Sequence, residues 1–265
     1  MNHLLPEVIE LSKQAGSSIM TVYQQGAGME VQRKDDNSPL TQADLAAHHI
    51  ITQGLEALTP EYPVISEESA SIPFSVRQQW RTYWLVDPLD GTREFIKRNG
   101  EFTVNIALID DHRPVLGVVY APALNLLFYA ASGRGAFRQM RSQAPQIIHS
   151  RAFDPTQVTV AGSRSHGDTR LLGFLDRIGP HMLISMGSSL KICLVAEGRA
   201  DIYPRLGPTC EWDTAAAQCV LEEAGGMLAD IERRPFRYNT KDSLLNPEFF
   251  ATGAMSPDWA QFIEK

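Results

Sequence analysis

The chain has 265 residues, 43% of them hydrophobic, which is enough for one large or two moderate domains around a sizeable core. Its 24 Lys and Arg residues against 31 Asp and Glu residues give a net charge of −7, which argues against a basic surface for polymeric nucleic acid. Three cysteines without a Cys-x-x-Cys spacing argue against a disulfide framework and a structural zinc site. With no signal-peptide pattern and no apolar run of membrane-spanning length, we expect a soluble, cytoplasmic protein.

The first half of the chain predicts two helices followed by an antiparallel sheet. Apolar residues at helical spacing predict helices over 4–24 and from Thr41 to about residue 58, with a break at 37–39. Alternating apolar segments separated by short turns predict the strands, the last three as a meander. The expected strands are 63–66, 83–86, 102–109, 115–120 and 126–131.

Beyond residue 145 the pattern changes to alternating strands and helices, which is typical of an α/β unit. Strands are expected at 158–161, 182–186 and 201–203, and helices at 168–178, 189–197 and 214–224. We therefore predict an N-terminal α+β domain over 1–148 with an antiparallel sheet, and a C-terminal α/β domain over 149–265.

The segment WLVDPLDGT (84–92), which begins within the second predicted strand, carries the strongest functional signal. Asp87 and Asp90 stand three positions apart, and Pro88 and Gly91 predict a rigid turn that holds them together. The backbone carbonyl of Leu89 adds a third oxygen of the kind that Mg²⁺ accepts. The simpler interpretation is a polar turn that only connects two elements.

Three further acidic residues, Asp44, Glu67 and Asp213, stand at predicted ends of helices or strands. Each has a purely structural interpretation. Asp44 and Thr41 together resemble a helix capping box. Glu67 and Glu68 resemble a solvated acidic loop. Asp213 could simply complement the dipole of the helix that it begins. Carboxylates gathered at one sheet edge repel one another unless cations neutralise them. The joint pattern therefore predicts a site for two or three Mg²⁺ ions, typical of phosphoryl chemistry.

Glu67-Glu68, the DPLDGT motif of 87–92 and Trp212-Asp213 resemble, in order and spacing, the signature of the inositol monophosphatase-like superfamily. These enzymes are lithium-sensitive Mg²⁺ phosphatases, and the resemblance extends over nearly the whole chain. It implies a layered αβαβα sandwich of mixed α+β and α/β character, with the metal site between the two halves. Four further segments resemble the bacterial 3′(2′),5′-bisphosphate nucleotidases of that superfamily, namely 92–109, 163–166, 187–191 and 203–209.

The resemblance also implies a role for each acidic residue of the cluster. Glu67, Asp87 and the carbonyl of Leu89 would hold one Mg²⁺. Asp87, Asp90 and Asp213 would hold a second, and a third would lie near Glu67. The first half of the chain would thus carry most of the metal ligands, and the second half would complete the site.

Asp44 and Thr92 are the implied catalytic pair. A hydroxyl backed by a carboxylate suits a group that orients the attacking water and removes its proton. The expected reaction is a direct in-line attack of water on phosphorus. The alternative is that Asp44 serves only as the helix cap described above.

The substrate is expected to contact two sets of residues. One set lies at the metal ions, and the other lies further along the site. In the second set, Gly187-Ser188-Ser189 begins a predicted helix, and the free N–H groups at the start of a helix favour the binding of an anion. Seen singly, these serines are ordinary helix caps and the basic residues are solvated surface groups. The implied contacts are Glu67, Leu89, Asp90, Gly91, Thr92 and Asp213 at the metals, and His166, Ser188, Lys191 and Arg205 beyond them.

By this resemblance, the expected function is Mg²⁺-dependent removal of the 3′-phosphate from 3′-phosphoadenosine 5′-phosphate, giving AMP. The same reaction on 3′-phosphoadenylyl sulfate would give adenylyl sulfate, and both would serve sulfur assimilation. The alternatives are an inositol or sugar phosphatase with the same metals, and a non-catalytic Mg²⁺ or nucleotide sensor. We expect a monomer, although the sequence leaves open both the oligomeric state and a peripheral position on the cytoplasmic face of the inner membrane.

Overall fold

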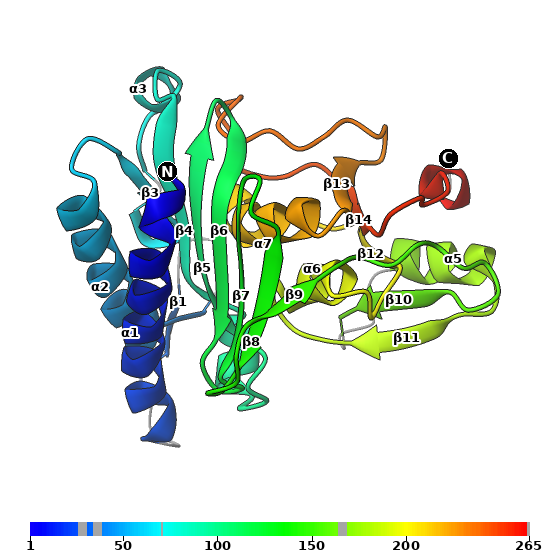
Figure 1. The fold of residues 1–265 in the computed structure, drawn as a ribbon, viewed down its shortest axis with the longest axis horizontal. Helices are drawn as coiled ribbons and strands as arrows, with labels where there is room; N and C mark the ends of the chain where they lie inside the picture. Colours follow the sequence, from blue (N-terminus) through cyan, green and yellow to red (C-terminus); the bar gives the residue numbers. More distant parts are fainter. Residues whose placement is uncertain (26–30, 34–38, 70, 164–168, 264–265) are drawn as a thin grey trace.

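The computed structural model describes residues 1–25, 31–33, 39–69, 71–163 and 169–263. Its elements form five layers in the order helices, sheet, helices, sheet, helices (Figure 1). The N-terminus lies in the first helical layer and the C-terminus beside the last one. The predicted αβαβα sandwich is therefore confirmed.

The first layer consists of helices α1 (Leu5–Gln24) and α2 (Gln42–Leu58), both close to the predicted bounds. A short 3-10 turn, η1 (Asn2–Leu4), precedes α1. Apolar residues of both helices pack against one face of the first sheet. A hairpin of β1 (Val31–Arg33) and β2 (Pro39–Thr41) was not predicted. Positions 37 and 38 of the predicted break lie outside the described residues.

The second layer is a seven-stranded sheet in the order β3-β4-β5-β6-β7-β8-β9. Strand β3 runs parallel to β4, and the remaining neighbours are antiparallel, so the predicted meander is confirmed. The last two strands were missed, because their outer positions are polar and partly exposed. The strands are β3 (Val64–Ser66), β4 (Thr82–Asp90), β5 (Thr103–Asp110), β6 (Arg113–Ala121), β7 (Leu126–Ala131), β8 (Ala136–Met140) and β9 (Gln146–Ile148).

Short helices follow the first two strands of this sheet. They are η2 (Glu67–Ser69) after β3, α3 (Phe74–Arg77) before β4, and α4 (Thr92–Ile96) after β4. None of these short helices was predicted, because each spans fewer than two helical turns. Two of them, η2 and α4, begin at residues of the predicted site.

The third layer consists of α6 (Leu190–Ala196) and α7 (Glu211–Glu223), enclosed between the two sheets (Figure 1). Every residue of α6 is buried. Helix α7 packs across β4, β5 and β6 of the first sheet and also contacts β13 of the second. The predicted helices are confirmed here, and they place residues of the second half of the chain directly against the first sheet.

The fourth layer is a five-stranded sheet in the order β11-β10-β12-β14-β13, covered by α5 (Thr169–Ile178) and η3 (Trp259–Phe262). Strand β10 is parallel to β11 and β12, as alternation of strands and helices predicts. Strands β13 and β14 were missed. A long loop rather than a helix joins β13 to β14, and β14 is antiparallel to both of its neighbours, β12 and β13. The strands are β10 (Thr159–Gly162), β11 (Met182–Ser185), β12 (Ile202–Arg205), β13 (Met227–Asp230) and β14 (Phe249–Thr252).

The predicted turn after residue 86 is wrong, because β4 continues to Asp90. Asp87 pairs with Asn105, and Asp90 pairs with Thr103, so three steps along β4 oppose two along β5. This is a β-bulge, and a bulge tolerates Pro88 because the extra residue does not need a ladder hydrogen bond. Gly91, at φ +92°, then ends the strand and begins α4.

The larger sheet ends at Ile148 and the smaller sheet begins at Thr159. The division into 1–148 and 149–265 stays a proposal, and one hydrophobic cluster contains residues of both parts. Within the described residues, no helix combines the length and the apolar character needed to cross a bilayer.

Candidate active site

An acidic cluster lies where the bulged end of β4 meets the first turn of α7. Asp87, Asp90 and Asp213 each contribute a carboxylate oxygen, and these oxygens lie within 4.8 Å of one another. Because of the bulge, Asp87 and Asp90 lie on the same face of β4 although they stand three positions apart. The packing of α7 on β4 brings the third aspartate from 123 positions further along the chain. The structure thus brings together three of the predicted metal ligands.

The cluster holds more negative charge than its surroundings can stabilise. Burial, followed by the charges of Glu67 and Asp90, raises the pKa of Asp87 well above its usual range, and Glu67 also hydrogen-bonds to Asp87. A hydrogen bond between two carboxyl groups requires a proton on one of them. Burial, followed by the charge of Asp90, raises the pKa of Asp213 to about 8, although the Cys210 N–H bond opposes this shift. These groups must hold protons or cations.

The donor set of the cluster fits Mg²⁺. All of its side-chain ligand atoms are carboxylate oxygens, which are the hard ligands that this ion prefers. The N–H of Leu89 donates to Asp87 Oδ1 at 3.0 Å, which orients that carboxylate. The carbonyl of Leu89 lies 3.5 Å from the hydroxyl of Thr92. Asp87, Asp90 and Asp213, with the Leu89 carbonyl and Glu67 beside them, would hold the ions.

We expect Mg²⁺ to raise the melting temperature more at pH 8 than at pH 6. Without a cation, the folded-state pKa of Asp213, about 8, lies above the ordinary 3.8, so its contribution to stability is present at low pH and is lost as the pH rises from about 4 to about 8. At one fixed Mg²⁺ concentration, equal to about 100 times the Kd at pH 8, binding adds roughly 2.7 kcal/mol at pH 8, or about 5–10 °C, and less at pH 6, where protons compete with the ion. Thermal melts with and without Mg²⁺ test this, and an increment that is equal at both pH values would contradict it.

Asp44 caps helix α2 and also contacts Thr92, its predicted catalytic partner. Its Oδ2 accepts hydrogen bonds from the N–H and the hydroxyl of Thr41, at 2.8 and 2.5 Å, which completes the capping box of α2. Its Oδ1 accepts a hydrogen bond from Thr92 Oγ1 at 3.3 Å. The two oxygens of the carboxylate therefore have different partners. The cap fixes the carboxylate, and the other oxygen faces the predicted catalytic partner.

The segment before α6 is not the free anion site that the sequence suggests. The N–H of Gly187 donates to Glu101 Oε2 at 2.9 Å. The N–H of Ser189 and the hydroxyl of Ser188 donate to Asp90 Oδ2 at 2.6 and 2.5 Å. The ordinary serine cap is wrong as well, because the Ser189 side chain makes no capping bond. These donors instead attach α6 to the acidic cluster.

A cleft of ≈ 340 Å³ extends from Asp90 and Asp213 toward β12. Of the predicted substrate contacts, Gly91, Ser188, Lys191 and Arg205 also line it, whereas His166 lies outside the described residues. Arg205 donates to the carbonyls of Gly207 and Pro208, at 3.2 and 2.7 Å, which holds its guanidinium at the rim. Cleft and acidic cluster form one continuous site.

The polar groups beneath this cleft were not predicted from the sequence. Thr103 and Asn105 are buried in β5 and form hydrogen bonds with the residues before α6. Glu101, also buried, holds the Gly187 N–H. The available signal was the pair of polar residues, two positions apart, at the start of an otherwise apolar strand, since residues at that spacing share one face.

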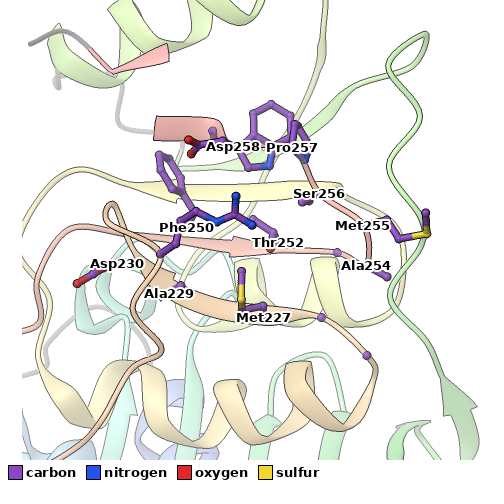
Figure 2. A pocket seen from close by; sticks show the side chains of 15 residues that line it. Met227, Ala229, Asp230, Phe250, Thr252, Ala254, Met255, Ser256, Pro257 and Asp258 are labelled. Carbon is purple, nitrogen blue, oxygen red and sulfur yellow. The ribbon is translucent and has the colours of Figure 1, made fainter. Parts of the chain in front are cut away.

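A second cavity, of ≈ 230 Å³, lies between β13, β14 and the segment 254–259 (Figure 2). Met227, Phe250 and Pro257 contribute to its largely apolar wall. Among the described residues, none of the predicted site residues lines it. The acidic cluster and its cleft, rather than this cavity, therefore form the candidate active site.

The fold and the acidic cluster define a class of protein, and the comparisons with known proteins agree. Residues 1–259 match the model of the inositol monophosphatase family. The chain belongs to this family.

Within the family, the chain is similar to proteins named 3′(2′),5′-bisphosphate nucleotidase CysQ. It is 51% identical over 246 residues to the one from Escherichia coli (strain K12), covering 93% of this chain and 98% of that protein. It is 39% identical over 265 residues to the one from Haemophilus influenzae, covering 99% and 97%. The crystal structure of CysQ from Bacteroides thetaiotaomicron matches with a TM-score of 0.82 at 39% identity, covering 96% and 97%. The predicted resemblance is therefore confirmed.

Proposed function

We propose that this protein is a Mg²⁺-dependent 3′(2′),5′-bisphosphate nucleotidase. The proposed reaction removes the 3′-phosphate of 3′-phosphoadenosine 5′-phosphate to give AMP and phosphate, and acts in the same way on 3′-phosphoadenylyl sulfate. The names of the relatives and the identity of 51% over most of the chain support this proposal. An acidic cluster with oxygen ligands supports the phosphatase mechanism.

One observation in the structure favours a substrate with two anions. Lys191 is 6% exposed and lines the cleft beside the acidic cluster. Its ammonium group donates to the carbonyl of Ser188 at 2.7 Å and lies 5.2 Å from the centre of the Tyr203 ring. No carboxylate among the described residues pairs with it. A buried cation is costly without a counter-charge, so this position suits an anion supplied by the substrate.

The geometry gives the two anions of a bisphosphate separate places. The 3′-phosphate would lie over Asp87, Asp90 and Asp213, and the 5′-phosphate toward Lys191, with Arg205 at the rim. An inositol or sugar monophosphate has only one phosphate and leaves Lys191 without a counter-charge. This difference is our reason for preferring the nucleotide over the inositol ester.

Asp44 and Thr92 would move the proton. Because the Thr92 hydroxyl donates its proton to Asp44 Oδ1, its oxygen keeps lone pairs that can accept a proton from the attacking water. The capping bonds from Thr41 hold the Asp44 carboxylate in this orientation. Mg²⁺, when bound, supplies the activation of the water and neutralises charge on the leaving oxygen. A non-catalytic sensor would have no use for this proton-transfer pair.

Replacing Lys191 with glutamine is expected to lower kcat/KM for 3′-phosphoadenosine 5′-phosphate by about 10- to 100-fold. A charge-assisted hydrogen bond contributes roughly 1.5–3 kcal/mol. Activity on adenosine 3′-monophosphate, which lacks the 5′-phosphate, should change by less than threefold. Lys13→Gln, at an exposed lysine of α1, is the matched control. An equal loss on both substrates would mean that Lys191 does not recognise the 5′-phosphate.

The bisphosphorylated nucleotide is the expected small-molecule partner, and we propose a monomer in the cytoplasm. A peripheral position on the cytoplasmic face of the inner membrane is compatible with the finding that no described helix is suited to crossing a bilayer.

A further inference from the structure

A buried polar network lies directly under the acidic cluster, in an otherwise apolar part of β5. Thr103 is fully buried and Asn105 is 1% exposed. On the opposite strand, these residues pair with Asp90 and Asp87, on either side of the β-bulge. Neither residue belongs to the site derived above. Buried polar groups are costly unless they are fully hydrogen-bonded, so two of them at this position require an explanation.

The hydrogen bonds of Asn105 connect three segments of the chain. Its Oδ1 accepts a hydrogen bond from the Ser189 hydroxyl at 2.8 Å and lies 3.1 Å from the oxygen of the Thr103 hydroxyl. Its Nδ2 donates to Asp90 Oδ2 at 3.5 Å. The opposite orientation of the amide would place its oxygen against the Asp90 carboxylate, where two acceptors repel each other. The surrounding groups therefore fix the orientation of this side chain.

The hydroxyl protons of the network have a consistent direction. Ser188 donates to Asp90 Oδ2, which leaves its oxygen free to accept from Thr103, whose hydroxyl lies against it. Ser189 donates its hydroxyl proton to Asn105 and its N–H proton to Asp90. Each hydroxyl proton thus has one acceptor, and Asp90 Oδ2 receives three donors. A carboxylate held by three donors has little freedom to rotate.

We propose that Asn105 is a positioning residue that fixes the Asp90 carboxylate for Mg²⁺ and fixes the start of α6 to the same carboxylate. It acts through Asp90 and touches neither the substrate nor the reacting atoms. The inference rests on the proposed Mg²⁺ site but is independent of the identity of the substrate. Groups that orient a metal ligand in this way typically contribute 10- to 100-fold to metal affinity.

Replacing Asn105 with leucine tests this proposal. Leucine has nearly the same size and shape, but it has no donor for Asp90 and no acceptor for Ser189. Titration calorimetry of the protein with Mg²⁺ alone, without a substrate, should show a Kd about 10- to 100-fold higher than in the parent protein. Because no substrate is present, failure of the proposed nucleotide specificity would not affect this measurement.

Thr59→Val is the matched control for a purely structural effect. Thr59 is buried, and its hydroxyl accepts a hydrogen bond from Trp84 Nε1 at 2.8 Å. This variant also loses a buried hydrogen bond on β4, so it should lower the melting temperature and leave the Kd for Mg²⁺ within twofold. If Asn105→Leu gives the same pattern, with lower stability and unchanged Mg²⁺ affinity, the positioning role is wrong.

Ser189→Ala provides a second, milder variant in case Asn105→Leu does not fold. It removes the hydroxyl that donates to Asn105 and keeps the N–H that donates to Asp90. We expect a Kd for Mg²⁺ that is raised by about threefold to tenfold, less than in Asn105→Leu. An unchanged Kd in a folded Ser189→Ala protein would contradict the proposal, because the amide of Asn105 would then need no partner to position Asp90.

Discussion

Replacing Asp90 with asparagine is expected to lower kcat/KM for 3′-phosphoadenosine 5′-phosphate by about 10³-fold or more. Asp90 is a member of the carboxylate cluster, and the substitution removes one of its charges while keeping nearly the same shape. Stabilisation of the transition state by metal ions is worth several kcal/mol, and each ~1.36 kcal/mol corresponds to a factor of ten in rate. The loss should be accompanied by a higher Kd for Mg²⁺, measured by calorimetry.

Asp110→Asn is the control for the Asp90 variant. Asp110 ends the neighbouring strand β5 and accepts a hydrogen bond from Thr82 at 2.8 Å, outside the cluster. It should keep parental activity and Mg²⁺ affinity. If Asp90→Asn keeps kcat/KM within tenfold of the parent, the cluster does not hold the catalytic ions.

Replacing Asp44 with asparagine is expected to lower kcat by about 10²- to 10⁴-fold, which is the usual contribution of general-base catalysis. Asparagine keeps an oxygen for the capping bonds of Thr41 but cannot take the proton that passes through Thr92. Because Asp44 lies outside the carboxylate cluster, the Kd for Mg²⁺ should change by less than threefold. Phosphate release under saturating substrate, with calorimetry of Mg²⁺ binding, measures both.

Thr92→Val provides the matching test of the pair. If Asp44 and Thr92 act as one unit, the two single variants and the double variant should all lose a similar factor in kcat, since groups that act together are strongly non-additive. Independent losses that multiply in the double variant would contradict the pair. A nearly normal kcat in Asp44→Asn would leave Asp44 with the role of a helix cap alone.

The layered architecture follows from signals that are local in the sequence. The helical spacing of apolar residues predicts α1 and α2, and short turns between apolar strands predict the meander β5–β7. The strands that were missed, such as β8 and β13, lack this pattern, because tertiary contacts rather than their own residues define them. Local patterns therefore predict the longer helices and the strands β3–β7 and β10–β12 well, and they miss β8, β9, β13 and β14.

The acidic site was predictable because its residues stand in recognisable motifs at the ends of elements. Its exact backbone was not, since a turn and a bulge use the same Asp-Pro and Asp-Gly signals, and only pairing with β5 distinguishes them. The attachment of Ser188 and Ser189 to Asp90 joins positions about a hundred residues apart. No local pattern indicates such a contact, and for the same reason the role of Asn105 emerges only from the structure.

The most direct test of the central claim is Mg²⁺-dependent phosphate release from 3′-phosphoadenosine 5′-phosphate and from inositol 1-phosphate at equal, low concentration. We expect a preference for the nucleotide of about 10- to 100-fold, consistent with one charge-assisted contact of roughly 1.5–3 kcal/mol at the second phosphate. Preference for the inositol ester would keep the metal mechanism but contradict the proposed role of Lys191. No release from either compound would contradict the enzymatic function itself and favour a sensor.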